Sequence, residues 1–329
     1  MTDRACRVSI VLCAYTADRW PELMAALDSV RRQTRPPQEI ILVIDHNPPL
    51  LARARTQLSD VVTIENRQPR GLSGARNSGI AIASGEVIAF MDEDATAAPD
   101  WLERLTAGYD DSEVLGVGGA IEPVWVTGRP TWFPPEFDWV VGCTYLGMSE
   151  ETSRVRNLIG CNMSFRREIF QQVGGFRSEI GRVGTRPVGC EETELCIRLN
   201  QHQPRGRLLY EPQARVFHQV PQTRSSWRYF VARCYSEGLS KAIVSKFVGA
   251  EAGLSSERAY TFRTLPRGVV RGLWAVMRRG DFAGLARASV IVGGLLATTL
   301  GFLSGRLQQG LPARQVEEMP DQTASGVVQ

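Results

Sequence analysis

The sequence of 329 residues has little net charge, no metal-binding cysteine pair and no dinucleotide-binding glycine motif. A net charge of +3 is too small to argue for a nucleic-acid partner. The seven cysteines contain no C-x-x-C spacing, so reduced, buried thiols are favoured over a zinc site or a disulfide framework. No G-x-G-x-x-G lies in the first expected strand-to-helix turn, which leaves a Rossmann dinucleotide fold without support.

The start of the chain also lacks the pattern of a secretory signal. Its first apolar run, Val8–Cys13, has only the length of a strand and is not followed by a cleavage site. We therefore expect the bulk of the protein to remain in the cytoplasm. With 43% hydrophobic and 22% charged residues, the chain has the composition of an ordinary globular protein with one large domain and an appendage.

The most informative segment is Gly85–Asp94, which reads GEVIAFMDED. The apolar run Val87–Met91 lies between a turn glycine and charges, as is typical of a buried parallel strand. Asp92, Glu93 and Asp94 should therefore lie at the carboxyl end of the strand, where open α/β sheets bind ligands. Asp92 and Asp94 can point to one side and share a divalent cation, which would relieve the repulsion among the carboxylates. A solvated acidic turn is the less favoured interpretation.

A second motif lies about 15 residues upstream, where Arg70–Gly79 reads RGLSGARNSG. Its glycines and two arginines suit an anionic group such as a diphosphate. Taken alone, the segment is better explained as a loop and helix start in which Ser73 caps the helix and Arg76 is exposed. Combined with the acidic pair, it predicts a metal-bridged nucleotide site.

Strand-like and helix-like patterns alternate over the first hundred residues. Apolar, β-rich runs predict strands, and apolar residues at i, i+4 and i+7 predict a helix between them. This order of elements indicates a parallel sheet with helices on both faces. The expected strands are Val8–Cys13, Glu39–Asp45, Val61–Ile64 and Glu86–Met91. One expected helix begins at Pro21, and another covers Ser73–Ala83.

The later part of the domain is less regular. Arg129–Trp139 is too rich in proline and aromatics for a regular element, and it could form either a wall over a ligand ring or an aromatic plug at the edge of the sheet. We expect further strands at Leu115–Ile121, Leu208–Tyr210 and Arg215–Phe217, and helices at Glu191–Arg198 and, after the segment Cys161–Arg166, at Glu168–Val173.

Three polar residues of this later part have two interpretations each. Acids in a first helical turn are stabilised by the helix dipole, so position alone gives Glu191 and Glu192 a structural role. A lone histidine after a strand is more often structural than a ligand. His218 could nevertheless complete the coordination of a cation held by Asp92 and Asp94.

The segment beyond Val220 is helical in pattern and basic. From Arg258 to Arg314, nine arginines are accompanied by a single acid, Asp281. Ala288–Gly305 contains 18 residues without a charge, just long enough to span a membrane but diluted by glycine, serine and threonine. We favour an interfacial or shallow membrane contact over a buried core helix, and either of these over a full span.

Five segments, taken in order, resemble the family 2 inverting glycosyltransferases with the GT-A fold. They read VSIVLCAYT, EIILVIDHN, GLSGARNSGIAIASGEVIAFMDED, GCNMSFRREIFQQVGGF and CEETELCIRL. The similarity extends from about Val8 to Lys241, roughly three quarters of the chain. It implies a GT-A catalytic domain over 1–220 with a mixed, mainly parallel α/β sheet. A helical, basic segment that could contact a membrane would cover 221–307, and a flexible tail 308–329.

The resemblance also implies which residues bind the donor. Ala14, Tyr15 and Asp45, at the ends of the first two strands, would hold the nucleoside. Arg76 would approach the diphosphate. Asn162 would lie in the segment that lines the pocket for the sugar and the acceptor.

For the metal and the catalytic base, the resemblance is equally specific. Asp92 and Asp94 fill the two acidic places of an Asp-x-Asp motif, which ties the nucleotide to Mg²⁺ or Mn²⁺. His218 takes the place of a histidine near that metal. Glu192 occupies the place of the catalytic base, although the family usually has aspartate there, so Glu191 remains an alternative.

The expected function is the metal-dependent, inverting transfer of a single sugar from a nucleotide-sugar donor to a hydroxyl. The acceptor would be a glycan or lipid-linked intermediate of envelope or extracellular glycan synthesis, at the cytoplasmic face of the cell membrane. Gln222–Trp227 reads QTRSSW rather than Q-x-x-R-W, which argues against a processive synthase. The alternatives are a nucleotide-sugar-binding protein without transferase activity and a nucleotidyltransferase, although only Arg19 is available near the first strand to hold a triphosphate.

Overall fold

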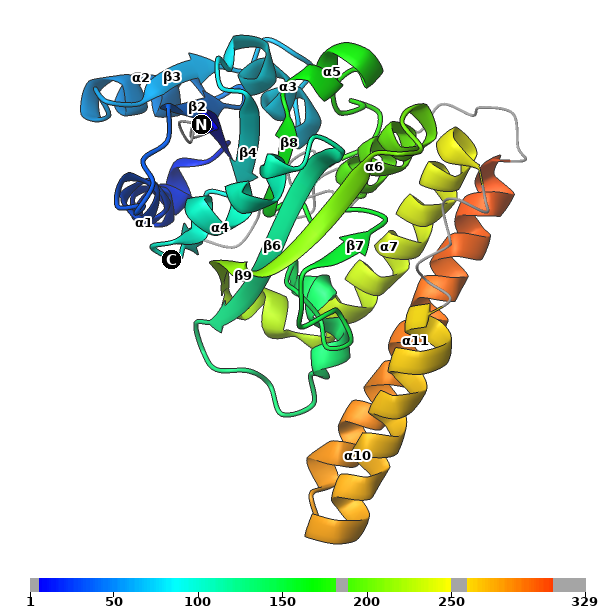
Figure 1. Ribbon diagram of the computed structural model, residues 1–329. Coiled ribbons are helices and arrows are strands. Elements are labelled where there is room, and N and C mark those ends of the chain that lie inside the picture. The colour runs from blue at the N-terminus through cyan, green and yellow to red at the C-terminus, as the bar shows by residue number, and fades with distance from the viewer. Residues whose placement is uncertain (1–5, 182–188, 250–258, 310–329) are drawn as a thin grey trace, which may run out of the picture.

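A curled sheet of nine strands forms the body of the protein, and a pair of long helices projects from one end (Figure 1). The computed structural model describes residues 6–181, 189–249 and 259–309. The strand order is β3-β2-β1-β4-β8-β6-β9-β5, and β7 pairs with β9. The strands are β1 Val8–Ala14, β2 Glu39–Ile44, β3 Val62–Glu65, β4 Val87–Met91, β5 Ala95–Ala97, β6 Val114–Trp125, β7 Ser153–Val155, β8 Asn162–Arg166 and β9 Arg207–Val220.

The first four strands in this order are parallel, as the alternating pattern predicts. Every residue of β1 and β4 is buried, which explains why both strands are continuous apolar runs. Successive side chains of β1 enter different cores: Leu12 packs against one face of the sheet and Val11 against the other. Helices therefore cover both faces, and the expected α/β class is confirmed.

The helices of the body lie between these strands. Two of them were not predicted, α2 and α4. In α2 two prolines occupy the first turn, where no backbone donor is lost, and the side chain of Asn47 accepts a hydrogen bond from the backbone N–H of Leu50. The helices are α1 Trp20–Arg31, α2 Pro48–Gln57, α3 Leu72–Ile82, α4 Trp101–Ala107, α5 Glu168–Val173 and α6 Glu191–His202, with 3-10 turns η1 Ala17–Arg19, η2 Gly108–Asp110, η3 Pro135–Val141 and η4 Gln222–Ser225.

The second half of the sheet is mixed, because β8 runs antiparallel to both β4 and β6. The prediction of two short strands at Leu208–Tyr210 and Arg215–Phe217 was wrong, since both belong to the single strand β9. The pairing of β9 with β6 skips residues 212–214, as Glu211 pairs with Gly119 and Arg215 with Ala120. This irregularity accommodates Pro212 within the strand.

Arg129–Trp139 joins the sheet to the helices that follow it. Phe133 and Phe137 are buried and lie with their ring centroids 5.5 Å and 5.3 Å from that of Phe230 on α7, Trp227–Val248. Trp139, together with Phe137, lines a cavity described below. Phe133 and Phe137 therefore correspond to the aromatic plug that the sequence suggested, and Trp139 corresponds to the wall.

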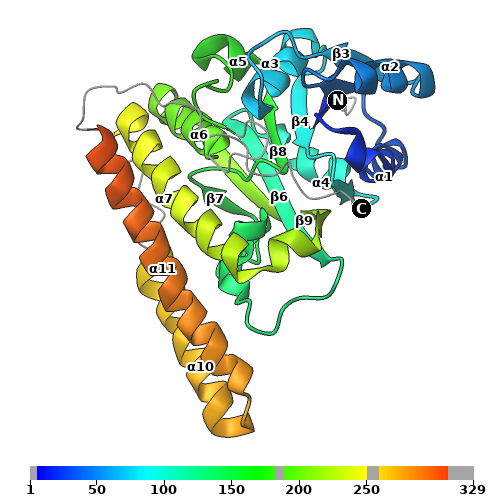
Figure 2. The same ribbon diagram turned by 180° about the vertical axis from the view of Figure 1, so that it is seen from behind.

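The C-terminal helices form a hairpin that leans on α7 (Figures 1 and 2). A π-helical turn η5, Tyr260–Thr264, leads into α10, Leu265–Arg279, and α11, Phe282–Gln309, returns along it. The predicted tail 308–329 lies outside the described residues from 310 onward, as do Arg258 and Arg314.

Glycines explain how α11 packs against α7. A Cβ on Gly301 would lie 2.0 Å from the backbone oxygen of Tyr235, and one on Gly238 2.0 Å from that of Thr298, so the two backbones touch. The opposite face of α11 is apolar and exposed, with Val292, Leu296, Leu300 and Leu303. The segment Ala288–Gly305 is thus neither a fully buried core helix nor free of the protein.

Within the described residues, α11 is the one helix that is long and apolar enough to cross a membrane. Of its most apolar stretch, 39% is buried inside the protein. That partial burial agrees with a helix that packs on one side and exposes the other. It does not by itself establish a membrane contact.

Candidate active site

Asp92 and Asp94 follow β4 at the carboxyl edge of the parallel strands, as the sequence predicts. The chain then enters β5, which pairs with β9 and places Ala95 opposite His218. This pairing brings the imidazole to the acidic turn, with Nε2 of His218 3.2 Å from Oδ1 of Asp94. One ligand atom from each of Asp92, Asp94 and His218 lies within 4.8 Å of the others, so the three could hold a metal ion.

Asp94 is held as an anion by the cations around it. Nη1 of Arg19 lies 3.1 Å from Oδ2 of Asp94, and Nη2 of Arg224 lies 3.7 Å from the same atom. Burial alone would raise the pKa of Asp94, but His218, Arg224 and Arg19 outweigh it and hold the pKa well below the ordinary value. The carboxylate is therefore ionised and ready to accept a metal.

The middle residue of the acidic turn, Glu93, is also buried and is hydrogen-bonded by Arg19 at 2.9 Å. Burial and the neighbouring Asp94 raise the pKa of Glu93 to about 7, against the effect of Arg19. The solvated acidic turn is therefore excluded. Sequence reasoning did not assign Arg19 and Arg224, although each closely follows a strand that ends at this edge of the sheet.

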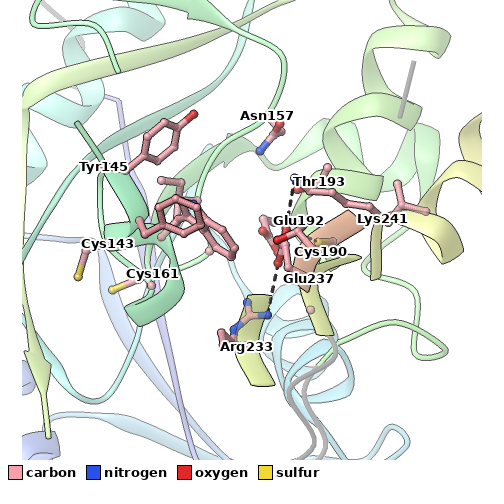
Figure 3. Close-up of a pocket in the computed structure, with 18 of the residues that line it drawn as sticks. Cys143, Tyr145, Asn157, Cys161, Cys190, Glu192, Thr193, Arg233, Glu237 and Lys241 are labelled. Atoms are coloured by element: carbon pink, nitrogen blue, oxygen red, sulfur yellow. Dashed lines mark hydrogen bonds and ion pairs between the residues drawn. The ribbon is translucent and has the colours of Figure 1, made fainter. Parts of the chain in front are cut away.

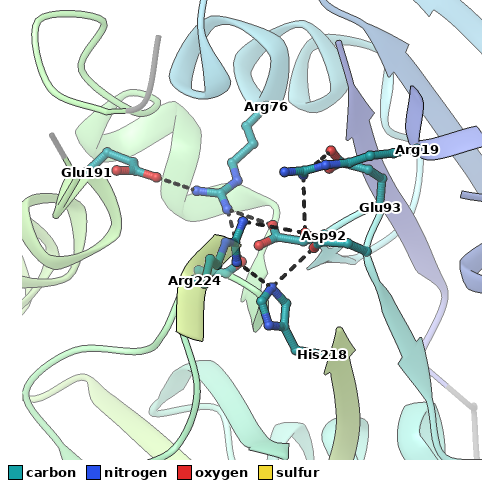
Figure 4. A network of polar contacts seen from close by, with 9 residues as sticks. Arg19, Arg76, Asp92, Glu93, Glu191, His218 and Arg224 are labelled. Atoms are coloured by element: carbon teal, nitrogen blue, oxygen red, sulfur yellow. Dashed lines mark hydrogen bonds and ion pairs between the residues drawn. The ribbon is translucent and has the colours of Figure 1, made fainter. Parts of the chain in front are cut away.

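Arg76 connects the acidic turn to helix α6 (Figure 4). Its guanidinium donates to Oε1 of Glu191 at 2.9 Å, to the backbone oxygen of Gly160 at 3.0 Å and to Oδ1 of Asp92 at 3.5 Å. The side chain is only 2% exposed, so the simple interpretation of an exposed helix-start arginine is wrong. The pairing with acids raises the pKa of Arg76 although burial opposes it.

A cavity of about 390 Å³ extends from this cluster to the C-terminal helices (Figure 3). Arg76, Asp92, His218 and Glu192 all line it. Asp92 of the metal cluster and Glu192, the predicted base, therefore line the same cavity.

The two adjacent glutamates of α6 have different surroundings. Glu191 is buried beneath Arg76 and ion-paired to it. Glu192 is partly exposed to the cavity. Burial and the charge of Glu191 raise the pKa of Glu192 to about 8.

Ala14, Tyr15 and Asp45 lie at the carboxyl ends of β1 and β2, beside β4. Tyr15 is 40% exposed. Asp45 accepts hydrogen bonds from the backbone N–H of Gly71 at 2.9 Å and from Nδ2 of Asn66 at 2.6 Å, so it fixes the loop before α3. None of the three belongs to the described residues that line the cavity. Their role in nucleoside binding stays a prediction.

Asn162 lies in a segment that lines the cavity, but it is not itself among the lining residues. Its side chain is fully buried in the sheet, where Nδ2 donates to the backbone oxygens of Ala120 and Ala214, and Oδ1 accepts from Nε1 of Trp101. The amide group is thereby occupied within the fold. The neighbouring Gly160 and Cys161 line the cavity instead.

Sequence reasoning also missed a row of charged residues on α7. Arg233, Glu237 and Lys241 all line the cavity. Nη1 of Arg233 lies 3.3 Å from Oε2 of Glu237, and Nζ of Lys241 lies 3.8 Å from Oε1 of the same residue. Their i, i+4 spacing on one helical face was the available signal.

A mixed sheet of this order, with an Asp-x-Asp pair after β4 and a cavity at the carboxyl edge, defines a GT-A-type glycosyltransferase. The fold resembles that of a mannosyltransferase from Pyrobaculum calidifontis solved with GDP-Man and Mn²⁺, with a TM-score of 0.55 and 16% identity over 89% of this chain and 87% of that one. It also resembles GalNAc-T7 solved with UDP, GalNAc and Mn²⁺, with a TM-score of 0.50 and 17% identity over 78% of this chain and 54% of that one.

The chain belongs to glycosyl transferase family 2, whose family model matches residues 9–174. A glucosyl-dolichyl phosphate glucuronosyltransferase of Haloferax volcanii is 37% identical over 242 residues, covering 72% of this chain and 77% of that protein. The succinoglycan biosynthesis protein ExoM of Rhizobium meliloti is 24% identical over 309 residues, covering 87% and 94%. The resemblance drawn from the sequence motifs is confirmed.

Proposed function

We propose that the protein transfers one sugar from a nucleotide-sugar donor to an acceptor hydroxyl, in a metal-dependent step that inverts the anomeric carbon. The observation that carries this proposal is the cavity that Asp92, Arg76 and Glu192 all line. A leaving diphosphate needs positive charge and an attacking alcohol needs a proton acceptor, and the residues of the cavity offer both.

On the donor side, Asp92, Asp94 and His218 would hold the cation. Two carboxylates and an imidazole suit Mn²⁺, whereas Mg²⁺ prefers oxygen ligands alone. When bound, the metal supplies positive charge to the leaving diphosphate. Asp92 is the most accessible of the three, while Arg19 and Arg224 fix Asp94 in its ionised form.

Arg76 has a second task on the donor side. Its side chain is locked by Glu191 and the backbone of Gly160, so its guanidinium already faces the cavity beside Asp92. A cation positioned in advance costs little reorganisation when a diphosphate arrives. We propose that Glu191 orients Arg76 rather than acting as the base.

The base is then Glu192. Its carboxylate would accept the proton of the acceptor hydroxyl while the hydroxyl oxygen bonds to the anomeric carbon and the bond to the diphosphate breaks. Attack from the face opposite the leaving group inverts the configuration. A base with a pKa of about 8 retains the proton well during transfer, although only about a tenth of it is ionised at pH 7.

For the acceptor, we propose a lipid-linked intermediate of envelope or extracellular glycan synthesis. The relative from Haloferax volcanii is named for action on a glucosyl-dolichyl phosphate. The exposed apolar side chains of α10 and α11 lie among arginines such as Arg267 and Arg278, which suits the anionic inner surface of a cell membrane. The protein would then be cytoplasmic and peripheral to that membrane.

A screen of UDP-, GDP-, dTDP- and CDP-sugars with Mn²⁺ tests the proposal. The correct donor should raise the melting temperature, since a ligand at a hundredfold excess over its Kd stabilises by about 2.7 kcal/mol. NMR of the product should show an inverted anomeric carbon. The proposal would be contradicted if no donor bound in the presence of Mn²⁺, or if the product retained its configuration. Donor binding without Mn²⁺-dependent hydrolysis or transfer would indicate a nucleotide-sugar-binding protein without transferase activity.

A further inference from the structure

The cavity continues past Glu192 into an arm that the transfer step does not explain. This C-terminal arm lies between α7, η5 and α11. Residues of these helices and residues of the metal cluster line one continuous cavity. A nucleotide-sugar held at Asp92 lies at the other end. The arm therefore faces the side from which an acceptor must approach Glu192.

One wall of the C-terminal arm carries charge. Arg233, Glu237 and Lys241 form one row on α7, and their side chains are 11%, 14% and 23% exposed. Arg156 lines the cavity as well. The row on α7 thus has two cations and one acid within largely enclosed surroundings, where electrostatic attraction is stronger than in water, and Arg156 adds a third cation to the lining of the cavity. Such a set suits a phosphate.

The other wall is largely apolar. Leu295 and Phe302 of α11 line the C-terminal arm, together with Leu265 at the start of α10. Thr298 lies between the first two on the same face of α11. A hydrocarbon chain would find few polar groups to desolvate along this wall.

The C-terminal arm opens onto the apolar face of α11. Thr299 lines the cavity and is also exposed, so the cavity reaches the surface at this residue. Three leucines surround that position on the helix, Leu296, Leu300 and Leu303, and they are 59%, 59% and 52% exposed. Residues three and four apart are neighbours on a helix, so Leu296 and Leu303 flank Thr299 directly.

We infer that the C-terminal arm binds the phosphate and the first part of the hydrocarbon chain of a lipid-linked acceptor. The phosphate lies beside Arg233 and Lys241. The chain leaves past Thr299 and lies over Leu296, Leu300 and Leu303 toward the membrane. The inference rests on the proposed function, because it names the acceptor of that same site.

The test measures binding of three small probes in the absence of a bilayer. Farnesyl phosphate has both phosphate and chain, isopentenyl phosphate has a short chain, and farnesol lacks the phosphate. Below the micellar concentration, calorimetry should show that the full-length protein binds farnesyl phosphate at least tenfold more tightly than either other probe. Equal affinities for all three, or no binding of farnesyl phosphate, would overturn the inference.

Variants test whether the phosphate of the probe binds to the charged wall on α7 and its hydrocarbon chain to the apolar wall on α11. Lys241→Gln should lower the affinity for farnesyl phosphate toward that for farnesol, while Thr299→Trp should lower it toward that for isopentenyl phosphate. Leu285→Gln is the matched control, since Leu285 is exposed on the same helix about 21 Å away along its axis. Melting temperatures show that each variant is folded. Equal losses in the control, or none in the other two variants, would overturn the inference.

Hydrolysis of the donor with Mn²⁺ in the absence of acceptor separates the two levels of the proposal. If the donor is hydrolysed normally but the probes bind without regard to Lys241 and Thr299, only the acceptor inference fails. If no donor is bound or hydrolysed by the wild-type protein, the proposed function fails, whatever the probes do.

Discussion

The carboxyl edge of the sheet and the α7–α11 helix pair line the same cavity but are held in place by different forces. At the sheet edge, buried charges fix one another, as Arg19 and Arg224 do for Asp94. In the helix pair, glycines allow two backbones to touch, as at Gly238 and Gly301. The first region should therefore respond to changes of charge, and the second to changes of side-chain volume.

The largest expected effect is on the charged region. Asp92→Asn removes a proposed metal ligand without changing the volume, so we expect kcat/KM to fall by about a thousandfold, with little change in melting temperature because Asp92 is 30% exposed. EDTA should abolish wild-type activity, and Mn²⁺ should restore it. Asp100→Asn, which alters an exposed aspartate paired with Arg104, is the control. Near-normal activity of Asp92→Asn would show that this charge does not hold the metal.

The helix pair should instead lose stability. Gly301→Ala places a methyl group against the backbone of Tyr235 and should cost about 1–3 kcal/mol of the free energy of unfolding. Gly293→Ala on the same helix meets only an ordinary contact at 3.6 Å from Trp227, and should be neutral or stabilise by about 0.5–1 kcal/mol. Denaturant unfolding measures both. Equal effects would mean that α11 does not pack closely on α7.

A smaller effect concerns pH. Burial, Glu191 and Glu237 raise the pKa of Glu192 to about 8, while Arg76 lowers it. As the proposed base, Glu192 can accept a proton only in its ionised form, so activity should increase as it loses its proton. The value of kcat/KM should rise about tenfold from pH 6 to pH 7 and level off above pH 8. Ionising this buried group also costs stability, so the melting temperature should fall from pH 5 to pH 8. A flat profile over this range would assign the base to another residue.

The smallest effect should come from the tip of the hairpin. Met277 and Phe282 are each 76% exposed there, and their joint replacement by glutamine should weaken binding to anionic vesicles about tenfold. Added salt should weaken it as well, because the arginines contribute. Val126→Gln, at a 62% exposed position outside the hairpin, is the control. Flotation assays measure the binding, and its absence in the wild-type protein would contradict the membrane contact.

Sequence alone predicted the region of regular strands well. A buried parallel strand such as β4 must be apolar along its length, so Asp92 and Asp94 could be placed at its end. His218 could only be suggested, because its approach to Asp94 depends on β5, and a strand of three residues has no readable periodicity.

The sequence predicted the remaining parts less well because orientation and packing decide them. Asn162 lies in the expected segment, but the register of β8 turns its side chain into the core rather than toward a ligand. The charged row that begins at Arg233 was missed because α7 mixes apolar and charged residues and has no clear apolar face from which the opposite, charged face could be recognised. For Ala288–Gly305, composition alone could not separate a buried helix from a membrane contact, since α11 has one buried face and one exposed apolar face.

The most direct test of the account is the comparison of donor binding and transfer in Glu192→Gln. The change removes the proposed proton acceptor but leaves Asp92, Asp94, His218 and Arg76 in place. We predict unchanged Mn²⁺-dependent donor binding and a transfer rate at least about a hundredfold below that of the wild-type protein. Transfer at the wild-type rate would contradict the account.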